Sequence, residues 1–89
     1  MEYLKGVREE LDKIDSKMID LFLKRMKISE EVAKIKSENN LPVFDYEREK
    51  QKLIHSVEHV NLEEKDDVRE FMQFLMDKSK QKQHKILEK

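Results

Sequence analysis

Two cations lie on the apolar side of a predicted helix, in the stretch DLFLKRMKISEEVAKIK at residues 20–36. At about 100° per residue, Arg25 and Lys36 share one narrow sector of that helix. They are about three turns, or about 16 Å, apart along the axis, so their long side chains can reach one small anion from both ends. Arginine and lysine bind carboxylates and phosphates. The spacing therefore indicates a site for an anion of metabolite size.

Ser79 and Gln83 interrupt a second apolar stripe in the same way. A buried cation costs several kcal/mol unless it is paired. One interpretation is therefore that Arg25 pairs with a carboxylate of a neighbouring helix or extends to solvent. The other interpretation is that Arg25 faces a polar cavity. Four polar interruptions on stripes that should face one another favour a cationic cavity inside a helical bundle, where ligand sites are common.

Three other candidates follow from the sequence. Arg8 lies in a neighbouring sector but about 25 Å before Arg25, so only an antiparallel partner helix could bring it to the same small site. Glu49 lies close to the apolar stripe of a second helix, where it is either a first-turn electrostatic residue or a hydrogen-bond partner for a ligand hydroxyl. His55 and His59 have a spacing that suits a shared metal, but no acidic ligand motif accompanies them. We interpret them as surface histidines and predict no metal site.

These side chains must be positioned by helices. One Gly and one Pro among 89 residues, together with abundant Leu, Lys, Glu and Met, favour an all-α fold. Apolar residues alternate at spacings of three and four through the first segment, which is typical of helices packed at coiled-coil angles. We expect a single domain, residues 1–89, with three helices at about residues 3–39, 46–60 and 62–87.

The expected helix boundaries rest on capping residues. Pro42 follows the end of the first helix, and Asp45 is a good N-cap for the second. The apolar stripe of the second helix reaches Val60, so we expect the helix to end there. Asn61 should begin the third helix, with Glu64 completing a capping box.

The length of the first helix predicts self-association. It should span about 55 Å, whereas a compact chain of this size has a diameter of about 30 Å. The helix must extend beyond its own domain, and an extended apolar stripe needs a partner. We therefore expect an intertwined homodimeric bundle in which two long helices run side by side.

The composition argues against other classes of function. With 19 basic and 20 acidic side chains, the net charge is only -1, so no global field directs the chain to nucleic acid or a membrane surface. Lys78, Lys80 and Lys82 step about 200° apart around a helix, and we interpret them as solvated surface residues. No apolar run is long enough to span a bilayer. The lack of cysteine permits a reducing compartment, and we expect a cytoplasmic protein.

Several motifs occur together along the chain. Arg8 is followed by LDKID, by Arg25 in the middle of the long helix, by VAKIK and then by PVFDYERE, and Ser79 and Gln83 follow in the third helix. In this combination the chain, from about residue 4 to 86, resembles the all-helical class of chorismate mutases. The resemblance implies a dimer of three-helix chains whose long first helices cross between protomers, in agreement with the argument from helix length.

The resemblance also implies a reaction and a substrate. The reaction is the Claisen rearrangement of chorismate to prephenate, the entry to phenylalanine and tyrosine synthesis, and it requires no cofactor. Arg25 and the partner subunit's Arg8 would bind the carboxylates of the substrate, with Arg48 and Ser79 assisting. Helical-wheel arithmetic places Arg48 opposite the apolar stripe of its helix, so its role rests on the resemblance.

The remaining implied roles concern two oxygens of the substrate, the ether oxygen and the ring hydroxyl. Lys36 and Gln83 would donate hydrogen bonds to the ether oxygen whose bond breaks. Asp45 and Glu49 would hold the ring hydroxyl. Because Gln83 is an amide, it would donate at neutral pH without first being protonated.

Two other functions stay open at this point. An isochorismate-pyruvate lyase has the same fold and similar cations, although Lys36 and Gln83 together favour the mutase. A noncatalytic helical dimerisation module would instead pair Arg25 and Lys36 with acidic residues across the interface. A chain of 89 residues leaves no room for a fused second enzyme domain, so we expect a monofunctional mutase.

Overall fold

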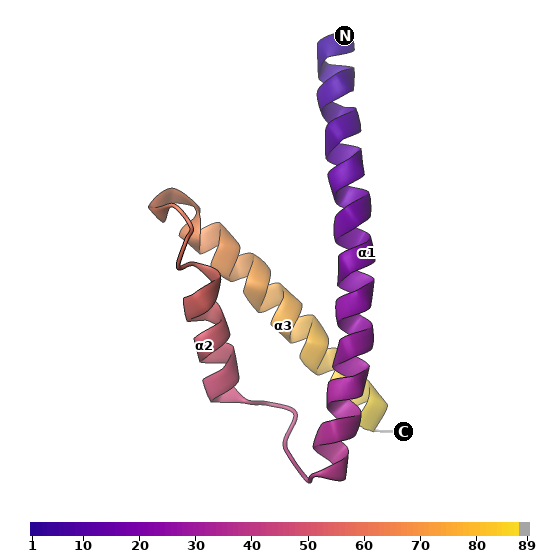
Figure 1. The fold of residues 1–89 in the computed structure, drawn as a ribbon, viewed down its shortest axis with the longest axis vertical. Coiled ribbons are helices and arrows are strands. Elements are labelled where there is room, and N and C mark those ends of the chain that lie inside the picture. Colours follow the sequence, from indigo (N-terminus) through magenta and orange to yellow (C-terminus); the bar gives the residue numbers. More distant parts are fainter. Residues whose placement is uncertain (88–89) are drawn as a thin grey trace.

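The computed structural model describes residues 1–87 and is all-α, as predicted (Figure 1). Within these residues there are three α-helices and one short 3-10 helix, and no strand. Within residues 1–87, none of the helices combines the length and the apolar composition that a membrane span requires. The elements in chain order are α1 (Glu2–Glu38), α2 (Tyr46–Ser56), η1 (Leu62–Glu64) and α3 (Lys65–Leu87).

Helix α1 extends well beyond the rest of the chain (Figure 1). The molecule measures 56 × 30 × 15 Å, and its radius of gyration is 16.7 Å, compared with about 12 Å for a compact chain of this length. The N-terminal half of α1 stands clear of α2 and α3. Its apolar stripe is consequently exposed, at Leu4, Val7, Leu11, Ile14, Met18 and Leu21.

Helix α3 packs against both α1 and α2. Helices α1 and α2 do not approach each other within 8 Å between Cα atoms. Residues of both helices and of α3 line a space between them. The buried apolar side chains are few, and they come from every part of the bundle: Ala33, Val43, Val57 and Met76. This small core fixes the three helices around the space.

The chain leaves α1 through a Schellman motif. The Leu41 N–H donates to the Lys36 carbonyl at 2.8 Å, and the Asn40 N–H donates to the Ser37 carbonyl at 3.3 Å. Asn40 has a φ of 55°, a left-handed conformation that asparagine adopts more readily than most residues. The motif reverses the chain, so that Val43 is buried near the end of α1 and α2 can begin beside it.

Helix α2 ends at Ser56, so the predicted end at residue 60 was wrong. Beyond Ser56 the backbone makes i to i+3 bonds, from Glu58 to His55 at 3.3 Å and from Val60 to Val57 at 3.3 Å. This tighter turn ends the helix while Val57 stays buried. The apolar stripe continues through the turn, and for that reason it gave no sign of the helix end.

The predicted capping box at the start of the third helix was also wrong. The Asn61 side chain makes no capping bond; instead its backbone carbonyl accepts from the Glu64 N–H at 2.9 Å. That bond satisfies the amide group that the side chain would have capped. It forms the 3-10 turn η1, which leads directly into α3.

Candidate active site

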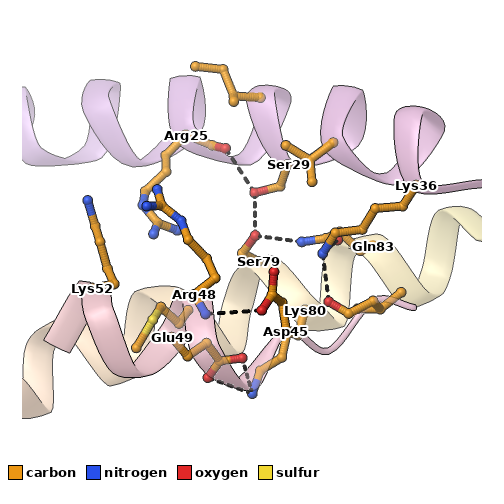
Figure 2. A pocket seen from close by; sticks show the side chains of 14 residues that line it. Arg25, Ser29, Lys36, Asp45, Arg48, Glu49, Lys52, Ser79, Lys80 and Gln83 are labelled. Carbon is orange, nitrogen blue, oxygen red and sulfur yellow. Dashed lines mark hydrogen bonds and ion pairs between the residues drawn. The ribbon is translucent and has the colours of Figure 1, made fainter. Parts of the chain in front are cut away.

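A cavity of about 320 Å³ lies between α1, α2 and α3 (Figure 2). Seven of the eight predicted site residues line it: Arg25, Lys36, Asp45, Arg48, Glu49, Ser79 and Gln83. Arg8, the eighth, is exposed on the free N-terminal half of α1 and does not line this cavity. A single chain therefore brings together all the predicted site residues except the one that was expected to come from a partner.

Lys36 and Gln83 are in direct contact at one end of the cavity. The Lys36 ammonium donates to the Gln83 Oε1 at 3.1 Å and to the Val43 carbonyl at 2.7 Å. Both acceptors are uncharged, so the positive charge of Lys36 is not neutralised by them. The contact also fixes the orientation of the Gln83 amide, because only its oxygen can accept from an ammonium group.

A chain of hydrogen bonds runs from Gln83 to the backbone of α1. The Gln83 Nε2 donates to the Ser79 Oγ at 3.0 Å, the Ser79 and Ser29 hydroxyls are 2.7 Å apart, and the Ser29 Oγ donates to the Arg25 carbonyl at 3.0 Å. Because Ser29 gives its one hydrogen to that carbonyl, Ser79 must donate to Ser29. The direction of every bond is thereby set. Ser29 and Gln83 are only 5% exposed, so water has little access to this chain of hydrogen bonds.

The guanidinium groups of Arg25 and Arg48 face each other near the other end of the cavity (Figure 2). Burial lowers the pKa of Arg25 below its ordinary value, and the positive charge of Arg48 lowers it further. Arg25 donates to the Leu75 carbonyl at 3.0 Å. Among residues 1–87, no carboxylate lies within ion-pair distance of Arg25, Lys36 or Arg48. An anion in the cavity would relieve this repulsion.

The N-cap and the first turn of α2 supply both acidic residues of the cavity. Asp45 is the N-cap, as predicted, and its Oδ1 accepts from the Arg48 N–H at 3.0 Å. This cap fixes the start of the helix and hence the direction in which Arg48 and Glu49 leave it. Glu49 forms an ion pair with Lys80 of α3, with 3.1 Å between the Glu49 Oε2 and the Lys80 Nζ.

Three further side chains of the site were not identified from the sequence as functional residues. Lys80 was interpreted as a solvated lysine, and this was wrong: it lines the cavity and is only 24% exposed. Lys52 lines the cavity one helical turn after Arg48 and Glu49. Ser29 shares the sector of Arg25 and Lys36, and that position was the signal that could have identified it.

His55 and His59 do not contribute to the cavity. The His55 Nδ1 lies 2.6 Å from the Glu58 Oε1, and both side chains are exposed. Among residues 1–87, no three potential ligands of the His, Cys, Asp and Glu types are grouped as a metal site would require.

The fold and the site together define a class: an all-α protein with a cavity between its helices that is lined by more cationic than acidic side chains. Comparison with known proteins identifies the family. The model of the family "Chorismate mutase type II" matches residues 7–84, and the chain belongs to this family.

Curated relatives share about half of the chain. The chain is 43% identical over 49 residues to the T-protein of Haemophilus influenzae, and 41% identical over 51 residues to the bifunctional chorismate mutase/prephenate dehydratase of Aquifex aeolicus. It is 38% identical over 50 residues to the chorismate mutase of Methanocaldococcus jannaschii. These matches cover 55%, 57% and 56% of this chain but only 13%, 14% and 50% of the respective relatives.

A solved structure matches along nearly the full length. It is a conserved hypothetical protein from Pyrococcus furiosus, with 35% sequence identity and a TM-score of 0.79. The match covers 93% of this chain and 97% of that one. The three-helix arrangement with a long first helix therefore also occurs in a solved structure.

Proposed function

We propose that this protein is a chorismate mutase, which rearranges chorismate to prephenate. The observation that carries the proposal is the cavity itself: Arg25, Lys36 and Arg48 face one space, and no carboxylate among the described residues neutralises them. Chorismate carries two carboxylates, which bind well to arginine side chains. Membership of the chorismate mutase family supports the same conclusion.

In this proposal, binding and catalysis use different ends of the cavity. Arg25 and Arg48 bind the substrate carboxylates, and Lys36 and Gln83 face the ether oxygen. The rearrangement is unimolecular, and negative charge develops on that oxygen as its bond to carbon breaks. Fixed donors placed at an oxygen that gains charge stabilise the transition state, and they need not reorganise during the reaction.

The hydrogen bonds of the cavity support this assignment of donors. Lys36 has three hydrogens, of which Val43 and Gln83 accept two. Gln83 has two amide hydrogens, of which Ser79 accepts one. In the described structure each group therefore keeps a hydrogen that it can donate to the ether oxygen. Asp45 and Glu49 are the acceptors for the ring hydroxyl.

We further propose that the active protein is a homodimer to which the partner subunit's Arg8 contributes. The apolar stripe of α1 is exposed along its N-terminal half. It continues into a mostly apolar groove of about 1020 Å³ between α1 and α3, whose lining includes Met18, Phe22, Phe71 and Phe74. Arg8 lies about 25 Å before Arg25 on its own helix and cannot reach the cavity of its own chain. A second copy, with its α1 antiparallel, would cover this surface and bring the partner subunit's Arg8 to the cavity.

Identification of reaction products tests the proposal. Purified protein is incubated separately with chorismate and with isochorismate, and the products are separated by chromatography. Prephenate from chorismate is the expected result. Salicylate and pyruvate from isochorismate, without prephenate, would assign the isochorismate-pyruvate lyase reaction instead. No turnover of either substrate would favour the noncatalytic dimerisation module.

The homodimer is tested with two inactive variants. Arg8→Ala and Lys36→Ala chains are mixed under conditions that exchange subunits, and activity is measured after heterodimers have been verified. We expect partial recovery, because one of the two sites then carries both wild-type residues. Verified heterodimers without activity would show that Arg8 does not act across the interface. The cytoplasmic location stays a prediction.

A further inference from the structure

Lys80 forms an ion pair with Glu49 at the edge of the cavity away from α1 (Figure 2). Its Nζ lies 3.2 Å from the Glu49 Oε1 and 3.1 Å from the Oε2, so it contacts both oxygens of the carboxylate. The two side chains are 24% and 16% exposed, less than is usual for a surface ion pair. Such a pair has a better-defined geometry than an exposed one, because water competes less for its charges.

Lys80 is itself held by two further groups. The Asp77 Oδ1 lies 3.5 Å from the Lys80 Nζ, and the Phe44 ring centroid lies 4.8 Å from it. Contact with an aromatic face stabilises an ammonium group. Burial lowers the pKa of Lys80, but the hydrogen bonds and charges of Glu49 and Asp77 together outweigh burial and raise it. Lys80 therefore remains charged and links α3 to α2 and to the segment before α2.

Two other cations near Glu49 compete with Lys80 for its carboxylate. Lys52 is three residues after Glu49, and residues at this spacing are neighbours on a helix surface. Arg48 precedes Glu49, and both cations line the same cavity. Without Lys80, the carboxylate would turn toward these cations and would compete with the negative charges of a bound ligand. Within residues 1–87, Lys80 is the one cation of another helix that forms an ion pair with Glu49.

We propose that Lys80 is a positioning residue: it holds Glu49 on the α3 side of the cavity, where the carboxylate accepts a hydrogen bond from the ring hydroxyl of the substrate. This inference rests on the proposed function. Lys80 neutralises Glu49 and leaves Arg25, Lys36 and Arg48 free for the substrate. Lys80 itself does not contact the reacting atoms.

Kinetics of single variants provide the first test. Lys80→Met should lower kcat/KM for chorismate about 10-fold, a loss within the range measured for coupled charged pairs. Lys80→Arg keeps the charge and should recover most of the activity. Lys50→Met is the control, because Lys50 is exposed on α2 and lies outside the cavity; its activity should stay within about two-fold of wild type. Wild-type activity in Lys80→Met would overturn the proposal.

A double-mutant cycle separates positioning from general support of the fold. In a Glu49→Gln background, Lys80→Met should change kcat/KM by less than about two-fold, because the carboxylate that Lys80 positions is no longer present. An equal loss in both backgrounds would show that Lys80 acts on the fold rather than through Glu49, and would overturn the proposal.

A crystal structure of Lys80→Met gives a readout that does not depend on activity. We expect the Glu49 carboxylate to leave its place beside α3 and to turn toward Lys52 or Arg48. A carboxylate in the same position as in the wild-type protein would refute the positioning role. If the wild-type protein failed to convert chorismate, the proposed function would fall, but this structure would still decide whether Lys80 positions Glu49.

Discussion

Replacing Gln83 by glutamate should make the activity depend on pH. The amide of Gln83 accepts from Lys36 at 3.1 Å and donates to Ser79 at 3.0 Å. An ionised carboxylate at this position would keep the contact with Lys36 but would have no hydrogen to donate. Loss of one donor to a developing oxyanion costs about 2.7–4 kcal/mol, or about 100-fold to 1000-fold in rate. We therefore expect Gln83→Glu to lose at least about 100-fold of the wild-type kcat/KM at pH 7.

Acidification should restore part of this loss. The introduced carboxyl regains a donor hydrogen when it is protonated. An exposed glutamate has a pKa of about 4.3. Burial favours the protonated form at this position, whereas the charge of Lys36 opposes protonation. The ratio of variant to wild-type kcat/KM should therefore rise steadily as the pH falls from 7 to 4.5. The amide of the wild-type protein does not titrate over this range.

The assay is the rate of chorismate consumption as a function of pH, measured for Gln83→Glu, wild type and a control. Gln51→Glu is a suitable control, because it makes the same charge change at an exposed position of α2. Its profile should follow that of the wild type. The reasoning would be refuted if Gln83→Glu kept nearly full activity at pH 7, or if its activity relative to wild type did not change with pH.

Three further predictions concern stability. Ser29→Ala leaves the Ser79 hydroxyl without its acceptor and should lower the free energy of unfolding in urea by about 1–3 kcal/mol, whereas the exposed Ser37→Ala should have little effect; equal effects would contradict the hydrogen-bond chain. Burial and the charge of Arg48 lower the pKa of Arg25, and a bound dianion offsets both effects. Chorismate at about 100 times its Kd should add about 2.7 kcal/mol of stability, seen as a raised Tm; an unchanged Tm would argue against binding in the cavity. Because the pKa of Lys80 is raised in the folded protein, its stabilising contribution is complete below the unfolded lysine value of about 10.4 and is lost only as pH rises through the higher folded value. The difference in unfolding free energy between wild type and Lys80→Met should then be constant from pH 7 to 9 and fall at higher pH; a fall below pH 9 would contradict this.

Helical periodicity made the α1 side of the site predictable. In a regular helix the sequence spacing fixes the angle between side chains, so Arg25 and Lys36 were expected on one face, and the structure places both in one cavity. The same reasoning placed Ser79 and Gln83 on the face of α3 that meets them. The length of α1 followed from an apolar stripe that continues without interruption by Gly or Pro beyond its first turns.

Features that depend on how helices lie relative to one another were not predictable. Lys80 neighbours Ser79 on α3, but whether it meets solvent or Glu49 is decided by the position of α2. That position depends on the Schellman turn at Asn40 and on the early end of α2. Arg48 shows the same limit, because it lies opposite the apolar stripe of its own helix and nevertheless lines the cavity. A helical-wheel projection describes one helix, whereas residues of three helices form this site.

The most direct test of the central claim compares substitutions of two lysines that lie about half a turn apart on α1. Lys36→Met removes the ammonium group that contacts Gln83 in the cavity, whereas Lys34→Met removes the same charge from an exposed position of the same helix. Formation of prephenate from chorismate is measured for both variants and for the wild type. The account predicts prephenate formation by the wild type and Lys34→Met at similar rates, with a loss of at least about 100-fold in Lys36→Met. Equal rates for the two variants would contradict it.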